Sequence, residues 1–271
     1  MERLLGLVQP VVTPLGEVVV LTLRALGRWC LFAREVIRWM PRRPRRWHLF
    51  FESCEFVGVQ STPIIVLTGV FVGMVFALQT GKAFALFNAE NLVGATIGLS
   101  LTREIGPVFT ALMVVARACS SMAAQIGSMR VTEQIDALET LAVDPIHYLA
   151  VPRVVATTIM TPLLTALFNF VGVIGGYMVA VGILQIDEGP LLDRLYHYVD
   201  MEDLWGGLCK AACFGFLISV ISCYSGYTTR GGAQGVGRAT TRAVVISSVT
   251  ILVVDYFLTA WILEFISPPS M

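Results

Sequence analysis

Charged side chains within long apolar segments are the residues of this 271-residue sequence with the most evident chemistry. Lys210 lies about two turns inside one such segment, and Asp255 lies near the middle of another. Arg103 and Glu104 stand at the start of a third, directly before a Gly-Pro pair. A charge at the centre of a membrane helix costs roughly 2.5–3.5 kcal/mol unless it lines a cavity or finds a partner. Cations placed in this way can donate charge-assisted hydrogen bonds to a phosphate.

Two interpretations of these charges stay open at this point. In the first, Lys210, Arg103 and Glu104 line a polar cavity for an amphipathic molecule. In the second, the two cations reach the outer headgroups and Glu104 pairs with Arg103. For Arg117, inside the same apolar segment as the Gly-Pro pair, helix packing or reaching the headgroups is the better explanation.

Catalytic motifs are missing. The sequence has no HExxH, no GxSxG and no GxxxxGK[ST] phosphate loop, and its three histidines are scattered. The glycine-rich run RGGAQGVGR, whose glycines span Gly231 to Gly237, follows no strand and is expected to be a flexible cytoplasmic loop. We therefore expect no catalytic residue, no metal site and no cofactor in this chain.

The composition is that of an integral membrane protein. The chain is 56% hydrophobic and only 14% charged, against roughly 25% charged in soluble domains. Acidic and basic residues are balanced at 19 each, so nucleic acid is not an expected partner. The six cysteines form no CxxC pair, and we interpret them as small buried hydrophobes rather than disulfides or metal ligands.

Five segments are long enough to cross a hydrocarbon core, which takes about 20 helical residues. The predicted fold is all-α, and its five spans cover residues 56–81, 105–129, 154–186, 204–229 and 244–263. In the third span, Gly172, Gly176 and Ala180 recur at every fourth position, which lets another helix approach closely.

The basic residues predict the orientation. Fourteen of the 19 lie on one side of the predicted spans and three on the other, namely Lys82, Arg103 and Arg194. The side rich in arginine is the cytoplasmic one. The N-terminus is therefore expected in the cytoplasm, and the C-terminus and the acidic loop after Ile186 on the opposite side.

Residues 1–55 are predicted to form an N-terminal amphipathic region. Arginines alternate with Trp29, Phe32, Ile37 and Trp39, which suits helices that lie in the membrane interface, and Trp47 to Glu55 is expected to form a second such segment. A sixth span over Leu4 to Leu23 is the alternative.

A polar insert, Gly127 to Pro145, separates the second and third spans. Its apolar residues Val131, Ile135, Leu138 and Ala142 recur at helical spacing, which predicts a short amphipathic helix ended by Pro145. A helix this short needs a surface for its apolar stripe, either its own membrane domain or another protein.

The run LTREIGPVFTALMVVARACSSMAAQIGSMRVTEQIDALETLAVDPIHYLAVPR, together with GRATTRAVV and VVDYFLTA, resembles the MlaE/YrbE permease family. The resemblance covers Phe56 to Ile266 and defines a permease domain over 56–266. It implies the membrane subunit of a bacterial inner-membrane ABC transporter that moves phospholipids or related lipids between the inner and outer membranes. It also implies a homodimer, two cytoplasmic ATPase subunits that bind ATP and Mg²⁺, a periplasmic MCE-domain protein and, in some systems, a STAS-domain protein.

The resemblance also assigns residues. Arg103, Glu104 and Lys210 match polar positions of the family's lipid cavity. The helix expected to couple to the ATPase comprises Glu133, Gln134, Ile135, Asp136, Ala137, Leu138 and Glu139. From their place in the spans, the apolar walls of the cavity are expected to be Phe71, Val75, Leu78, Phe84, Phe87 and Leu258. We expect the apolar stripe of the coupling helix to enter the ATPase.

A secondary transporter and an intramembrane enzyme are the two alternative functions. A secondary transporter of a hydrophobic or amphipathic substrate also needs intramembrane charges, but it is expected to show repeated halves with broken helices, and five spans do not divide in that way. An intramembrane enzyme needs a nucleophile or a metal constellation that the sequence does not offer.

Overall fold

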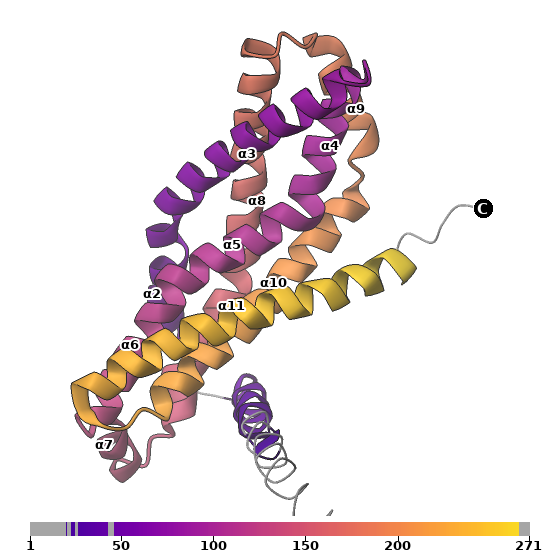
Figure 1. Cartoon of the computed structure of the whole chain (residues 1–271). Helices are drawn as coiled ribbons and strands as arrows, with labels where there is room; N and C mark the ends of the chain where they lie inside the picture. The colour runs from indigo at the N-terminus through magenta and orange to yellow at the C-terminus, as the bar shows by residue number, and fades with distance from the viewer. Residues whose placement is uncertain (1–19, 21–22, 25–26, 43–45, 266–271) are drawn as a thin grey trace, which may run out of the picture.

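A computed structural model describes residues 20, 23–24, 27–42 and 46–265 of the chain. These residues are helical and include no strand, as expected. Five helical stretches are long and apolar enough to cross a membrane: Trp47–Ala85, Glu90–Val131, Ile146–Gly182, Met201–Tyr227 and Gly232–Ile262. They lie beside one another as a tilted bundle (Figure 1).

Several of these stretches are built from more than one helix. The first comprises α2 (Trp47–Val57), a 3₁₀ turn (Val59–Ser61) and α3 (Thr62–Ala85). The second begins with a 3₁₀ turn (Glu90–Leu92) and comprises α4 (Val93–Ser100), α5 (Gly106–Val114) and α6 (Ser120–Val131), joined by π-helical turns at Leu101–Ile105 and Val115–Cys119. The others are α7 (Gln134–Thr140), a π-helical turn (Ile146–Ala150) leading into α8 (Val151–Gly182), α9 (Glu188–Tyr198), α10 (Met201–Tyr227) and α11 (Gly232–Phe265).

The second stretch begins earlier than the predicted residue 105. The predicted span left Arg103 and Glu104 at its outer end, directly before Gly106 and Pro107. In the structure the π-helical turn Leu101–Ile105 accommodates the proline, and the helix continues back through α4. Arg103 and Glu104 therefore lie inside a long helix and not at its end.

Two predicted loops are largely helical. The chain turns after α10 over Thr228 to Gly231, where Gly231 has a φ of +90°, and the rest of the glycine-rich run, from Gly232 with a φ of +65°, forms the first turns of α11. The expectation of a flexible loop is wrong. Glycine weakens a helix, but it does not prevent a helix whose other residues pack against the rest of the protein. The acidic segment after Ile186 contains α9, which packs against α4.

Glycines bring α3 and α8 into close contact. A Cβ atom added at Gly73 would lie 1.9 Å from the main-chain oxygen of Gly172, and one at Gly175 would lie 2.3 Å from that of Val70. The predicted stripe of Gly172, Gly176 and Ala180 is buried, and its two glycines lie against the side chains of Leu101 and Ile97 as well as the main chain of α3. The small-residue pattern therefore marks a helix–helix contact within the chain.

This contact gives a first prediction. Gly73→Ala is expected to destabilise the folded chain by at least the roughly 1–3 kcal/mol typical of an overpacked core, because its neighbour is main chain and cannot rotate away. Gly182→Ala is the matched control, since no atom lies within 4 Å of the added carbon. Thermal unfolding in detergent should show a lower midpoint for Gly73→Ala alone. Equal midpoints for both variants would contradict the close packing.

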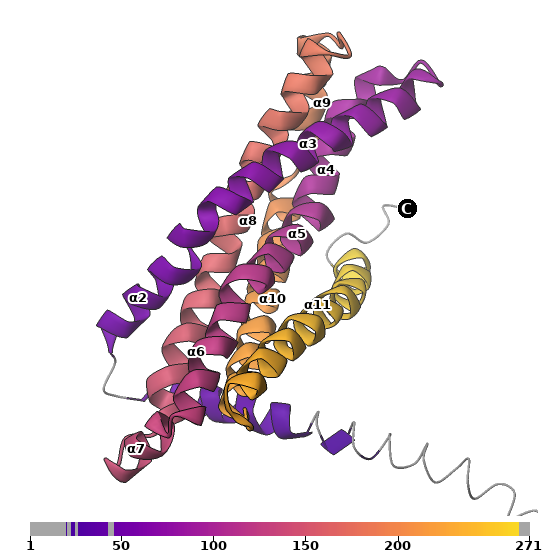
Figure 2. The same cartoon turned by 60° about the vertical axis from the view of Figure 1, so that its left-hand side comes forward.

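The N-terminal helix lies across the α7 end of the bundle (Figure 2). Residues 27–39 are helical, with Phe32 and Val36 buried and Arg28, Arg34 and Arg38 exposed. Phe32 packs edge-on against Tyr224 near the end of α10, with ring centroids 5.6 Å apart. Most of the alternative span, Leu4 to Leu23, falls outside the described residues. The second segment predicted as interfacial, Trp47 to Glu55, forms most of α2, which packs along α8 and belongs to the first apolar stretch, Trp47–Ala85.

Candidate functional site

Lys210 lies at the centre of a polar cluster between three helical stretches. Its side chain is 3% exposed, and Nζ lies 2.8 Å from Glu104 Oε1, 2.7 Å from Thr259 Oγ1 and 3.4 Å from Asp255 Oδ1. Nζ also donates to the main-chain oxygen of Arg103 at 3.1 Å. A buried ammonium is tolerated only with such partners. We call Glu104, Lys210, Asp255 and Thr259 the lysine cluster.

The local sequence explains why the chain can offer these partners. In an α-helix the N–H of Pro107 would bind the carbonyl of Arg103, but proline has no N–H. That oxygen accepts a hydrogen bond from Lys210 instead. Asp255 and Thr259 are four residues apart on α11 and so share one face of the helix. Thr259 Oγ1 also lies within 3.1 Å of Glu104 Oε1.

The cluster holds two carboxylates and one ammonium, and its members differ in access. The Glu104 side chain is 41% exposed and that of Asp255 is 19% exposed. Glu104 is therefore the carboxylate that an incoming molecule can reach most easily. Exchange of this carboxylate for another anion would leave the ammonium paired.

Arg103 does not join the cluster through its side chain. Its Nε donates to Asp203 Oδ1 at 2.7 Å, and Asp203 also belongs to the capping box at the start of α10. The interpretation that Glu104 pairs with Arg103 is wrong, because adjacent helix positions point in different directions and each side chain finds a partner on another helix. Arg103 thus contributes a carbonyl to Lys210 and an ion pair at the head of α10.

The six residues predicted as apolar walls separate into two groups. Phe71 and Val75 on α3, and Phe87 beyond it, expose more than half of their surface. Leu78, Phe84 and Leu258 pack against the edge of the apolar core. Of the six, only Leu258 lies on a helix that contributes to the lysine cluster, next to Thr259 on α11. The other five lie on α3 or just beyond it, and α4 and α5 lie between α3 and α11 (Figures 1 and 2). Within one chain, Phe71, Val75 and Phe87 thus face away from the bundle.

Two members of the cluster were absent from the predicted site. Asp255 was recognised as an intramembrane charge but not assigned to the site, and Thr259 was not recognised at all. Their four-residue spacing on one apolar helix was the available signal. Because the contacts join positions 104, 210 and 255, no local pattern could bring them together.

Arg117 has a structural role at the break between α2 and α3. Its Nη1 donates to the main-chain oxygen of Phe56 and, at 2.8 Å, to Ser61 Oγ, and its guanidinium lies 4.8 Å from the centre of the Phe56 ring. A break in a membrane helix frees main-chain oxygens that need donors. Arg117 supplies one, in agreement with the packing interpretation.

The short helix α7 packs on its own bundle. Ile135 is fully buried and Leu138 packs beside it, in a cluster with Ile126, Ile146 and Val220. The prediction that this stripe enters a partner is therefore wrong for Ile135 and Leu138, because apolar residues of α6 and α10 already cover them. The exposed side of α7 is mostly polar and comprises Gln134, Asp136, Ala137, Glu139 and Thr140; Glu133, directly before the helix, is exposed as well.

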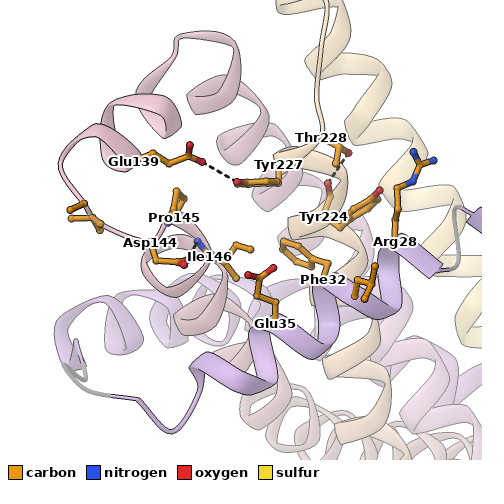
Figure 3. Close-up of a pocket in the computed structure, with 13 residues that line it drawn as sticks. Arg28, Phe32, Glu35, Glu139, Asp144, Pro145, Ile146, Tyr224, Tyr227 and Thr228 are labelled. Atoms are coloured by element: carbon orange, nitrogen blue, oxygen red, sulfur yellow. Dashed lines mark hydrogen bonds between the residues drawn. The ribbon is translucent and has the colours of Figure 1, made fainter.

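Both ends of α7 are held in defined geometry. Glu133 and Ala142 have φ of +60° and +57°, an uncommon conformation for residues other than glycine. Tyr227 donates a hydrogen bond to Glu139 at 3.3 Å (Figure 3). The helix ends at Thr140 and not at Pro145. Asp144 accepts hydrogen bonds from the N–H groups of Ile146 and His147, at the start of the next helix. Pro145 fits the first turn of that helix.

The cysteines only partly match their interpretation. All six are free, but only Cys119 and Cys223 are buried, whereas Cys30, Cys209 and Cys213 are exposed. An apolar segment predicts burial in membrane or protein and cannot tell the two apart. Among the described residues no group of histidine, cysteine or carboxylate side chains is arranged to hold a metal ion.

These features define a multi-pass helical membrane protein with a polar ion-pair site inside its apolar bundle. Residues 50–261 match the family model described as Permease MlaE, and the chain therefore belongs to the MlaE permease family. It is not expected to be an enzyme in its own right, since the family consists of permeases.

Several curated proteins are similar to this chain over most of its length. A probable ABC transporter permease protein of Rickettsia felis is 45% identical over 236 residues, which cover 87% of this chain and 91% of the relative. The intermembrane phospholipid transport system permease protein MlaE of Haemophilus influenzae is 37% identical, covering 92% of this chain and 96% of the relative. The chloroplastic protein TRIGALACTOSYLDIACYLGLYCEROL 1 of Arabidopsis thaliana is 34% identical, covering 86% and 67%.

Proposed function

We propose that this chain is the permease subunit of an ABC transporter that moves phospholipids between the inner and outer membranes of a bacterium. The observation that carries the proposal is its 37% identity, over 92% of the chain, to a permease of an intermembrane phospholipid transport system. The charge distribution supports an inner-membrane location with a cytoplasmic N-terminus and a periplasmic C-terminus. The α7 end of the bundle is then the cytoplasmic end.

The lysine cluster is proposed to receive the lipid headgroup. A phosphate can replace the accessible Glu104 carboxylate as the partner of Lys210 without leaving a buried charge unpaired. The released carboxylate can then meet a cationic headgroup amine. Asp255 and Thr259 keep Lys210 in position during the exchange.

Two copies of the chain are proposed to enclose the lipid. A bundle of five spans is small for a molecule with two acyl chains, and a two-fold axis would double the surface available. α11 supports this arrangement, since it bears a row of exposed apolar side chains: Val245, Val249, Leu252, Val253, Tyr256 and Phe257. The outward-facing Phe71, Val75 and Phe87 can line the cavity only if a second copy lies against α3.

A cytoplasmic ATPase is proposed to dock on the exposed polar side of α7 and to bind ATP and Mg²⁺. The buried Ile135 and the partly buried Leu138 pack α7 against apolar residues of α6 and α10, so movement of α7 would be passed to the helices that carry the cluster. By family resemblance, a periplasmic MCE-domain protein and, in some systems, a STAS-domain protein complete the assembly.

Purification of the intact membrane complex tests this function. We expect an ATPase subunit to copurify with the chain, and its ATP hydrolysis to fall when the chain is removed and to rise when phospholipid is added. A complex without an ATPase, in which an ion gradient alone drives substrate movement, would instead identify a secondary transporter. The two outcomes exclude each other.

A further inference from the structure

A pocket lies at the α7 end of the bundle, away from the lysine cluster. It encloses about 270 Å³ between the segment that follows the N-terminal helix, the start of α2 and the start of α8. Its lining includes the side chains of Arg42, Arg46, Trp47, Phe50, Val155 and Ile159. Nothing in the mechanism proposed above uses this pocket.

The lining is cationic at one end and apolar along the rest. Arg42 and Arg46 precede α2, whereas Phe50 lies one turn inside it. On α8 the lining continues from Val151 to Ile159, about 12 Å along the helix at 1.5 Å per residue. None of the lining residues is acidic. The pocket therefore matches an amphiphile with an anionic head and an apolar tail.

The two guanidinium groups are available to an anion. That of Arg46 lies 4.4 Å from the centre of the Tyr148 ring and that of Arg42 lies 4.6 Å from the centre of the Trp39 ring. Among the described residues neither arginine forms an ion pair, and Arg46 Nη1 is buried without a hydrogen-bond partner. Because an unsatisfied buried donor is costly, an anionic oxygen at this position would stabilise the site.

We propose that this pocket binds an anionic phospholipid from the membrane leaflet at the α7 end. Its phosphate lies against Arg42 and Arg46, and one acyl chain lies along Phe50, Val155 and Ile159. The bound lipid joins the N-terminal helix and α2 to α8, so it is a resident lipid and not the transported one. The continuous apolar wall on two membrane helices favours a lipid over a soluble anion, which would need only the cationic end.

Native mass spectrometry of the purified full complex tests the site, with phosphatidylglycerol and phosphatidylcholine as probes. We expect a preference of about tenfold or more for phosphatidylglycerol, as two arginines near a membrane surface would give. Arg42→Gln with Arg46→Gln should remove the preference. Arg38→Gln, a change of the same charge on an exposed neighbouring residue, should keep it. An equal preference in the double variant and the wild type would overturn the proposal.

Two further measurements identify the ligand and separate this site from the lysine cluster. Val155→Phe should fill the apolar part of the pocket and remove the preference while both arginines stay; if the preference persists, no acyl chain occupies the pocket. Competition by inorganic phosphate or ATP would identify a soluble-anion site and overturn the lipid proposal. The preference is measured as lipid bound and not as lipid transported, so a failure of the transport proposal would not affect this result.

Discussion

Lys210→Met is expected to reduce phospholipid transport by about 100-fold or more, because the variant removes the ammonium that the headgroup phosphate would bind. The substitution also leaves Glu104 and Asp255 facing each other without a cation. Breaking a buried ion pair in this way costs about 3–5 kcal/mol, so some loss of stability is expected as well. Transport of labelled phospholipid by reconstituted protein, normalised to folded protein, measures the effect.

A triple variant separates transport from stability. Lys210→Met combined with Glu104→Gln and Asp255→Asn removes all three charges while keeping the side chains similar in size, and it is expected to recover much of the thermal stability. Transport should stay lost, since no cation is available for the phosphate. If the triple variant regains transport, the cluster only holds α10 and α11 together.

Leu141→Asp with Ala137→Arg is expected to weaken ATPase binding by about 30-fold or more, the effect of losing a residue at the centre of an interface. Leu141 is 73% exposed, directly after α7, and Ala137 is exposed on the same short helix. The bundle should stay folded because neither side chain packs inside it. Copurification of the ATPase with the variant chain measures the loss.

Two control variants make this result specific. Leu141→Met keeps the apolar surface and should retain the ATPase. Ile135→Asp should lower the yield of folded chain, because it buries a charge at a fully buried position. If the ATPase copurifies in wild-type amount with Leu141→Asp and Ala137→Arg, the exposed side of α7 is not the docking surface.

The sequence was sufficient to predict the class of fold. Long apolar segments must form helices in a bilayer, where every main-chain polar group needs an internal partner. The cost of intramembrane charge also pointed to Lys210 and Glu104, which the structure joins. These inferences held because they rest on the composition of single segments.

Contacts between segments were harder to predict. The second membrane stretch begins well before the predicted residue 105, because the helix continues through a π-helical turn that has no distinct sequence pattern. Of the predicted apolar stripe only Ile135 and Leu138 lie on α7, and they were assigned to the wrong partner, since periodicity gives an apolar face and not what covers it. Thr259 was missed because a lone threonine in a membrane helix usually bonds its own main chain.

Reconstitution of the chain with its ATPase tests the central claim most directly. Vesicles that hold both subunits and a headgroup-labelled phospholipid are supplied with ATP and Mg²⁺, and transfer of the label to an added MCE-domain protein is followed. The proposed function predicts transfer that requires ATP, the ATPase and Lys210. Transfer at the same rate without ATP, or with an ion gradient in place of ATP, would contradict it.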